Sequence, residues 1–293
     1  DTMLDRYHHG FANNLNSTAP VPVLKILDSE ESPGASAHIA IGLTSFGMEV
    51  SFHTAVGDDI ESGSIISTLK TMGVGSENII QVKGRSTLTK IRFFGSRESL
   101  LDRSQILLQA DRGPNEPLDN SVSDSLIESA RSNISDSCAL VISDYDKGVV
   151  SNHGAQTLIE TANEKGIPVI VDPKLTGLEK SRGATVVIFE KRGMSLLSRR
   201  IGLDDNDAAK RLLEEYSWEG ILVLGGIHGI HLHQKEHDSI FMPCMAPTAD
   251  QQIGMHDAAA TSLAAALGSG LDLYDASLLA SAACDCVLSA STG

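Results

Sequence analysis

The residues best placed to do chemistry lie near the end of the chain, where an acidic side chain opens an alanine-rich helix. The segment reads Gln251-Gln252-Ile253-Gly254-Met255-His256-Asp257 and continues as Ala258-Ala259-Ala260. Backbone N–H groups at the start of a helix are unpaired and attract anions. An Asp there can accept a proton from an alcohol while the N–H groups hold a phosphoryl group. The segment therefore predicts Asp257 as a base beside an anion hole formed by Gly254, Met255 and His256.

The elements that must position this segment alternate along the chain. Short apolar runs at residues 139–142, 168–171, 185–189 and 221–224 are separated by helical stretches such as 154–165. Fully apolar strands between helices are typical of a parallel sheet covered on both faces. Upstream, the pattern predicts a helix over 34–46, a strand over 50–54 and a helix that starts at Asp58 and Asp59.

Two regions interrupt this alternation. Residues 8–33 contain an extended segment entered through Pro20 and Pro22, and residues 79–110 contain the strand formers of 86–94. We expect these two insertions to form one small sheet that lies like a lid beside the main domain. The predicted fold class is α/β.

The composition excludes several classes of function. The chain has 293 residues, of which 41% are hydrophobic and 21% are charged, and its formal net charge is −15. This charge argues against nucleic acid or an anionic membrane as the main partner, and no apolar run is long enough to span a membrane. The four cysteines lack zinc-ligand spacing and are predicted to be free thiols in a reducing compartment, so we expect a cytoplasmic protein.

Six further blocks occur in the order in which one enzyme family carries them. They are Asp1-Thr2-Met3-Leu4-Asp5-Arg6-Tyr7, Ala19-Pro20-Val21-Pro22-Val23, Pro33-Gly34-Ala35-Ser36-Ala37-His38, Thr87-Leu88-Thr89-Lys90-Ile91-Arg92, Ser143-Asp144-Tyr145-Asp146-Lys147-Gly148 and Val171-Asp172-Pro173-Lys174. With the segment ending at Asp257, they resemble the PfkB/ribokinase family of sugar kinases. Within that family they resemble the heptose-7-phosphate kinase domain of bacterial lipopolysaccharide-precursor synthesis. The resemblance covers essentially the whole chain, as a single domain over 1–293.

This resemblance implies a Rossmann-like three-layer ribokinase fold with a small β-sheet lid. It implies transfer of the γ-phosphoryl group of ATP to a sugar hydroxyl, with Mg²⁺ and with Asp257 as the catalytic base. On the substrate side it points to Asp1, His38, Lys147 and Lys174, and on the nucleotide side to Glu190, Gly225 and Ser281. We expect a sugar phosphate as ligand and a homodimer through the lid. Relative to the family the chain looks like an excerpt that lacks the first strand and the terminal helix.

The departures from the family pattern cluster in the motifs that handle ATP. Gln251, Ile253 and His256 replace the family's first Asp, its Thr and its last Gly before the catalytic Asp. The family's magnesium-linked Asn-x-x-Glu falls on Glu190 and Gly193. The Arg and Asn on its nucleotide side fall on Gly225 and Ser281, and His38 replaces the final Asn of its sugar motif. Because an imidazole is larger than a glycine hydrogen, His256 is expected to crowd the approach of a phosphate.

Each candidate also has a plainer interpretation. Asp257 could be a first-turn acid that only favours the helix dipole. Lys147 and Lys174 follow buried strands, where α/β sheets bind ligands, but either could be a surface lysine. His231 and His233 share a face of a predicted strand, yet without a third ligand they are simply solvent-facing, and no metal site is predicted.

Two hypotheses of function follow from these residues. The first is an ATP-dependent sugar-phosphate kinase whose phosphoryl transfer is impaired or lost. The second is a non-catalytic relative that acts by binding a ligand or by assembly. Coordinated losses at the nucleotide, magnesium and phosphate contacts favour loss of transfer, because each such contact contributes orders of magnitude in rate.

Overall fold

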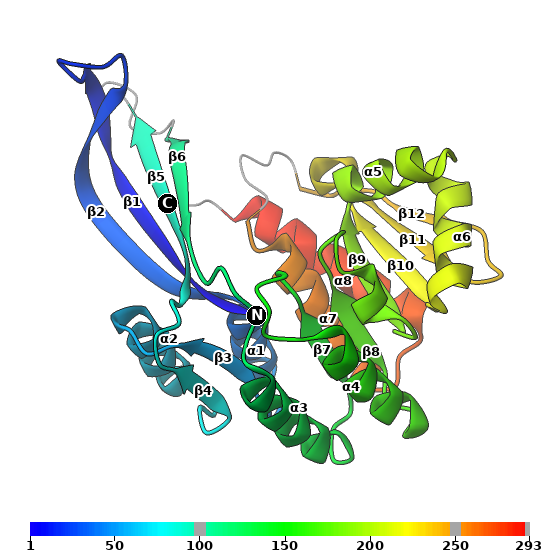
Figure 1. Ribbon diagram of the computed structural model, residues 1–293. Coiled ribbons are helices and arrows are strands. Elements are labelled where there is room, and N and C mark those ends of the chain that lie inside the picture. The colour runs from blue at the N-terminus through cyan, green and yellow to red at the C-terminus, as the bar shows by residue number, and fades with distance from the viewer. Residues whose placement is uncertain (97–103, 247–252, 291–293) are drawn as a thin grey trace.

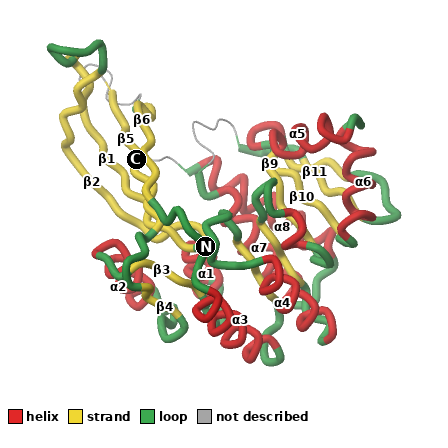
Figure 2. The backbone as a smooth tube through the Cα atoms, in the orientation of Figure 1, coloured by secondary structure: helices red, strands yellow, loops and turns green. Residues whose placement is uncertain are grey.

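The fold is described from a computed structural model over residues 1–96, 104–246 and 253–290. Figure 1 shows the arrangement and Figure 2 the distribution of helix and strand. The elements in chain order are β1 (Thr2–Leu15), β2 (Pro22–Ala35), α1 (Ser36–Ser45), β3 (Thr54–Gly57), α2 (Ile60–Thr71), β4 (Ile79–Val82), β5 (Leu88–Ser96), β6 (Gln105–Arg112), α3 (Asn120–Ile134), β7 (Leu140–Ser143), α4 (Asn152–Glu164), β8 (Val169–Asp172), η1 (Leu178–Ser181), β9 (Val186–Glu190), α5 (Lys191–Ile201), α6 (Asp205–Tyr216), β10 (Gly220–Leu224), η2 (Gly226–His228), β11 (Ile230–Gln234), β12 (Ile240–Met242), α7 (Met255–Gly268) and α8 (Leu273–Ser289).

The main domain is a six-stranded sheet between two layers of helices. Its order is β12-β11-β10-β9-β8-β7. Strands β7 to β10 run parallel, and β11 pairs antiparallel with both β10 and β12. Val169 and Val171 pack with α3 to α6 on one face, whereas Ile170 packs with α1, α7 and α8 on the other. Because side chains alternate between the faces of a strand, burying both faces requires continuous apolar runs. The predicted three-layer α/β class is confirmed.

The lid is a four-stranded sheet that projects from the main domain (Figure 1). Its order is β2-β1-β5-β6, so the two insertions meet through parallel pairing of β1 with β5. Glu61 of α2 anchors its base through ion pairs with Arg6 of β1 at 3.6 Å and Arg112 of β6 at 2.8 Å. The buried Arg92–Asp5 pair joins β5 to β1 at 2.5 Å. The Glu61 pairs thus fix the base of the lid to α2, and the Arg92–Asp5 pair joins neighbouring strands of the lid.

Several predicted boundaries need correction. The lid strands begin at Thr2 and end at Ala35, beyond the predicted 8–33. Residues 79–82 form β4, which pairs with β3 in a separate two-stranded sheet, so the second part of the lid starts at Leu88. The strand predicted over 50–54 starts only at Thr54. Pairing with β4, a non-local contact, decides where β3 begins. Residues 97–103 of the predicted lid lie outside the described residues. Gln251, in the segment before Asp257, also lies outside them.

Local signals placed several helices correctly. The side chain of Asp59 caps α2 by accepting from the Ser62 N–H at 3.0 Å, and Ser62 completes a capping box. The expected helix over 154–165 is α4, whose Ser151 cap accepts from Gly154 N–H. A glycine-flanked hairpin joins β10 to β11 through η2. No helix within the described ranges combines the length and apolar character needed to cross a bilayer.

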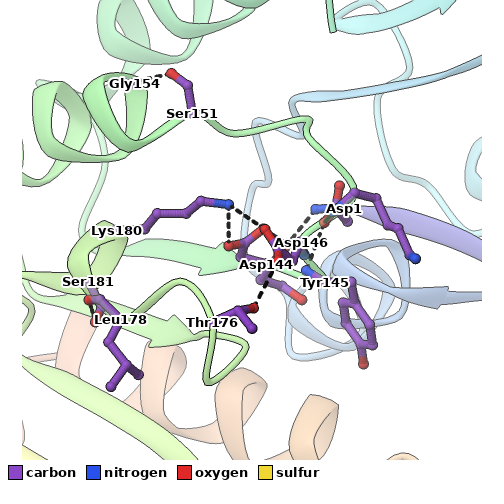
Figure 3. Close-up of polar contacts among 12 residues, drawn as sticks. Asp1, Asp144, Tyr145, Asp146, Ser151, Gly154, Thr176, Leu178, Lys180 and Ser181 are labelled. Atoms are coloured by element: carbon purple, nitrogen blue, oxygen red, sulfur yellow. Dashed lines mark hydrogen bonds and ion pairs between the residues drawn. The ribbon is translucent and has the colours of Figure 1, made fainter. Parts of the chain in front are cut away.

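A buried ionic network joins the loops after β7 and β8 (Figure 3). Lys180 Nζ donates to Asp144 at 2.8 Å and to Asp146 at 3.3 Å, and Thr176 donates to Asp146 at 2.8 Å. The side chain of Asp144 is fully buried. Buried charges of this kind are tolerated only when they are paired. The network therefore holds together the two loops that carry Tyr145 and Lys174.

We predict that Lys180→Met lowers the free energy of unfolding by about 3–5 kcal/mol, because it leaves the Asp144 carboxylate buried without its partner. The matched control is Arg131→Met, which breaks the exposed Arg131–Glu128 pair and should cost less than about 1 kcal/mol. Urea denaturation of both variants measures the difference. Equal losses in the two variants would contradict a structural role for the network.

Candidate active site

A cleft of about 620 Å³ lies where the base of the lid meets the carboxyl ends of β8 and β9. The lid contributes residues of β1, β2 and β5, and the main domain contributes the segments after β7, β8 and β9 and the start of α7. Its lining is Met3, Asp5, Ala35, Lys90, Arg92, Tyr145, Asp172, Pro173, Lys174, Leu175, Ile188, Phe189, Glu190, Arg192, Gly193, Leu196, Ile253, Gly254, His256 and Asp257. Ligands of open α/β sheets bind at this edge, so the cleft is the candidate active site.

Asp257 lies in the first turn of α7 and lines the cleft. One of its carboxylate oxygens contacts His38 Nδ1 at 3.1 Å, and the other is buried without a hydrogen-bond partner within the described residues. Burial raises the pKa of this carboxyl, against the opposing effect of His38. A carboxylate with a free oxygen and a raised pKa has the properties of a general base.

The start of α7 keeps the geometry of an anion site. Gly254 caps the helix in a left-handed conformation with φ of 84°, which favours glycine, and no side chain caps the first turn. Among the described residues no hydrogen bond satisfies the N–H groups of Met255 and His256, whereas Ala258 N–H bonds to Gly254. This helix start is compatible with the anion hole expected from the sequence, which stays a prediction.

His256 is held in the cleft by two carboxylates. Its Nδ1 is 2.9 Å from Asp172 Oδ1, and its Nε2 is 3.6 Å from Glu190 Oε1. Burial alone would lower the pKa of His256, but the charge and hydrogen bond of Asp172, together with Glu190, outweigh it and raise the pKa to about 10. The side chain is therefore a fixed imidazolium at neutral pH. We call His256, Asp172 and Glu190 the His256 cluster.

Basic side chains gather around an aromatic ring in the same cleft. Lys174 Nζ lies 4.3 Å and Lys90 Nζ 4.9 Å from the centre of the Tyr145 ring. Burial raises the pKa of Tyr145 well above its usual value, so its ring stays neutral. Arg92 lines the cleft beside Lys90 on β5. In an acidic protein, such a local group of cations favours a phosphorylated ligand.

The other predicted ligand residues occupy different positions. Asp1 is buried outside the cleft lining, where its carboxylate accepts from the backbone N–H groups of Tyr145 at 2.7 Å and Lys147 at 3.1 Å. The side chain of Lys147 is exposed and does not line the cleft. His38 also lies outside the lining and contacts it through Asp257. Asp1 and Lys147 thus shape the loop that carries Tyr145.

Of the three residues predicted to face the nucleotide, only Glu190 lines the cleft. Gly225 lies in the tight connection between β10 and β11, where its N–H bonds to Gly229 at 2.9 Å. A Cβ at Gly225 would lie 2.4 Å from the Gly229 carbonyl, so this backbone leaves no room for a side chain. Ser281 is buried in α8, away from the cleft lining.

Sequence reasoning assigned no role to Lys90, Arg92 or Asp172. Lys90 and Arg92 are two residues apart on β5, and this spacing places both on one face of a strand. That signal was available in the sequence. The contact between Asp172 and His256 spans 84 residues, and no local pattern predicts it.

Comparison with known proteins now identifies the family. The model of the pfkB family carbohydrate kinases matches residues 28–292. The chain belongs to the PfkB family of carbohydrate kinases. It is 33% identical over 294 residues to the bifunctional protein HldE of Halorhodospira halophila and 30% identical over 290 residues to that of Shewanella piezotolerans. Each alignment covers 98% of this chain but only 58% of the relative, so the chain spans little more than half of their length.

Solved structures confirm the predicted ribokinase fold. Ribokinase of Arabidopsis thaliana, complexed with ribose and ATP, superposes with a TM-score of 0.72 at 16% identity, over 100% of this chain and 91% of that one. The tetrameric inhibited form of phosphofructokinase-2 from Escherichia coli gives 0.75 at 16% identity, over 98% and 91% of the two chains. At these identities the similarity concerns the fold alone.

Proposed function

We propose that this PfkB-family chain binds a sugar phosphate in its cleft, and that transfer of a phosphoryl group from ATP is slow or lost. Membership of a carbohydrate kinase family supports a sugar as ligand. The cations Lys90 and Lys174 in the cleft support a phosphorylated sugar. A heptose 7-phosphate is the substrate class suggested by the sequence resemblance, and the HldE relatives are consistent with it.

In this proposal the ligand phosphate binds near Tyr145, between Lys90 and Lys174. Ammonium groups form strong charge-assisted hydrogen bonds with phosphate. A sugar hydroxyl then faces Asp257, whose free oxygen could accept its proton. The unpaired N–H groups at the start of α7 would face the anionic end of a phosphoryl donor.

One observation carries the proposed loss of transfer: the imidazole of His256 is fixed inside the cleft at the first turn of α7. In the family pattern a glycine at this position lets the backbone approach the transferred phosphoryl group. Here the side chain is held by Asp172 and Glu190 and cannot leave without exposing two carboxylates to each other. A phosphoryl group at the helix start would therefore compete with it for space.

The residues present also fit ATP and Mg²⁺ poorly. No group of three His, Cys, Asp or Glu side chains suited to a metal ion occurs in the described part of the chain. The cleft carboxylates Asp172 and Glu190 already contact His256, and Gly193 replaces the magnesium-linked Glu. Gly225 and Ser281, the remaining positions expected on the nucleotide side, lie outside the cleft lining.

A second candidate function is a working sugar-phosphate kinase. Asp257 favours it, because the base is retained in the cleft with a raised pKa and a free carboxylate oxygen. A phosphoryl donor whose geometry avoids His256 would make this candidate possible. Measurement of turnover separates it from the first.

We predict that heptose 7-phosphate binds the wild-type chain and that Lys174→Met weakens this binding about 10- to 100-fold, because a charge-assisted hydrogen bond contributes about 1.5–3 kcal/mol. Isothermal titration calorimetry measures both affinities. Lys165→Met, at the end of α4 and outside the cleft, is the matched control and should bind like the wild type. Absence of binding to the wild type, or equal affinity in both variants, would refute the proposed ligand site.

We predict little Asp257-dependent release of ADP from ATP by the wild-type chain. His256→Gly alone should restore little ADP release. A variant that combines Ile253→Thr, Met255→Ala, His256→Gly and Gly193→Glu should restore more, because such groups act as a unit. Gly193 can accept a side chain, since an added Cβ meets only Leu175 at 3.5 Å. A coupled ADP-release assay with heptose 7-phosphate measures these rates, and Asp257→Asn is the control. Robust turnover by the wild type that Asp257→Asn abolishes would support the second candidate.

We also propose that two chains associate through the lid. Its edge strands β2 and β6 carry exposed apolar side chains, among them Ile26 at 48% and Leu108 at 58% exposure. A projecting sheet with unpaired edges and apolar surface is unfavourable in water unless another surface covers it.

We predict a particle mass near twice the 31.1 kDa of one chain in light scattering at high micromolar concentration. The double variant Ile26→Glu, Leu108→Glu should be monomeric, because it places charges on the surface that would be covered. Ile60→Glu, at an exposed apolar residue of α2, is the control and should leave the mass unchanged. A monomeric wild type at this concentration would contradict assembly through the lid.

A further inference from the structure

The His256 cluster has the arrangement of two carboxylates around a cation. Asp172 ends β8 and Glu190 ends β9, and these parallel neighbours pair at Val171 and Val187. Their carboxyl ends meet at the same edge of the sheet, which brings the two acidic side chains to one side of the cleft. The start of α7 then places His256 between them, with one ring nitrogen toward each carboxylate.

The charge of the imidazole follows from its contacts. Ionised carboxylates only accept hydrogen bonds, and a neutral imidazole carries one proton for its two nitrogens. Here Nδ1 is within hydrogen-bond distance of Asp172, and Nε2 faces Glu190 and is buried without any other partner in the described ranges. Favourable contacts on both sides therefore require both nitrogens to be protonated. The side chain is a cation, and a protonated nitrogen cannot bind a metal.

We propose that His256 occupies the position of a divalent cation between Asp172 and Glu190, so that the wild-type cleft excludes a metal ion that these carboxylates would otherwise bind. The positive charge facing an anionic ligand then belongs to the chain itself. Carboxylate oxygens are the ligands that Mg²⁺ and Mn²⁺ prefer, and removing the imidazole leaves two of them facing the same space. This inference concerns metal binding alone and stands whether or not a sugar phosphate binds.

Binding of Mn²⁺, followed by electron paramagnetic resonance at pH 7.5 without nucleotide or sugar, tests the proposal. His256→Ala should bind Mn²⁺ at least tenfold more tightly than the wild type. Adding Asp172→Asn should cancel this gain, which separates the site from weak surface binding to a chain of net charge −15. His38→Ala is the matched control, because it removes the other histidine that contacts a cleft carboxylate, Asp257, without freeing a pair of carboxylates.

A second pair of variants separates charge from size and covers a failure of His256→Ala to fold. His256→Gln keeps a polar side chain but loses the charge, and it should gain Mn²⁺ affinity. His256→Lys keeps a cation and should not. Circular dichroism confirms the fold of each variant. The proposal is overturned if the wild type already binds Mn²⁺ through Asp172, or if folded His256→Ala and His256→Gln both bind no more tightly than the wild type.

Discussion

Burial of the main sheet between two layers of helices is the constraint on which the rest of this structure depends. It requires strands such as β8 and β9 to be apolar along their whole length, so polar side chains can appear only where the strands end. Asp172 and Glu190 are the last residues of those strands. The site for chemistry therefore lies at one edge of the sheet, and α7 closes that edge with its N-terminus.

Two sets of cationic side chains in the cleft differ in what neutralises them. The imidazolium of His256 contacts two carboxylates, so it contributes little free charge to an incoming anion. Lys90 and Lys174 contact the neutral ring of Tyr145 instead, and their charge remains available. The cleft thus favours an anionic group beside Tyr145. At the start of α7, the side chain of His256 leaves less room for such a group.

The departures from the family pattern at positions 193, 225 and 256 each have a physical consequence. A histidine at position 256 would be unfavourable beside a bound cation, and a glycine at 193 removes the side chain linked to that cation. Gly225, in turn, fits a tight connection in which a larger residue would meet a backbone oxygen at 2.4 Å.

The α/β class, the three layers, the lid and the position of Asp257 at a helix start could all be predicted from the sequence, because apolar periodicity, capping residues and ordered motifs are local signals. The sequence also indicated that His256 is the unusual residue. It did not indicate that β4 leaves the lid to pair with β3, that Lys147 lies outside the cleft lining, or that Lys180 is buried beside Asp144. These features depend on the tertiary packing, as do the two carboxylate partners of His256. Contacts between residues far apart in the chain depend on how strands align, and no short stretch of sequence records that alignment.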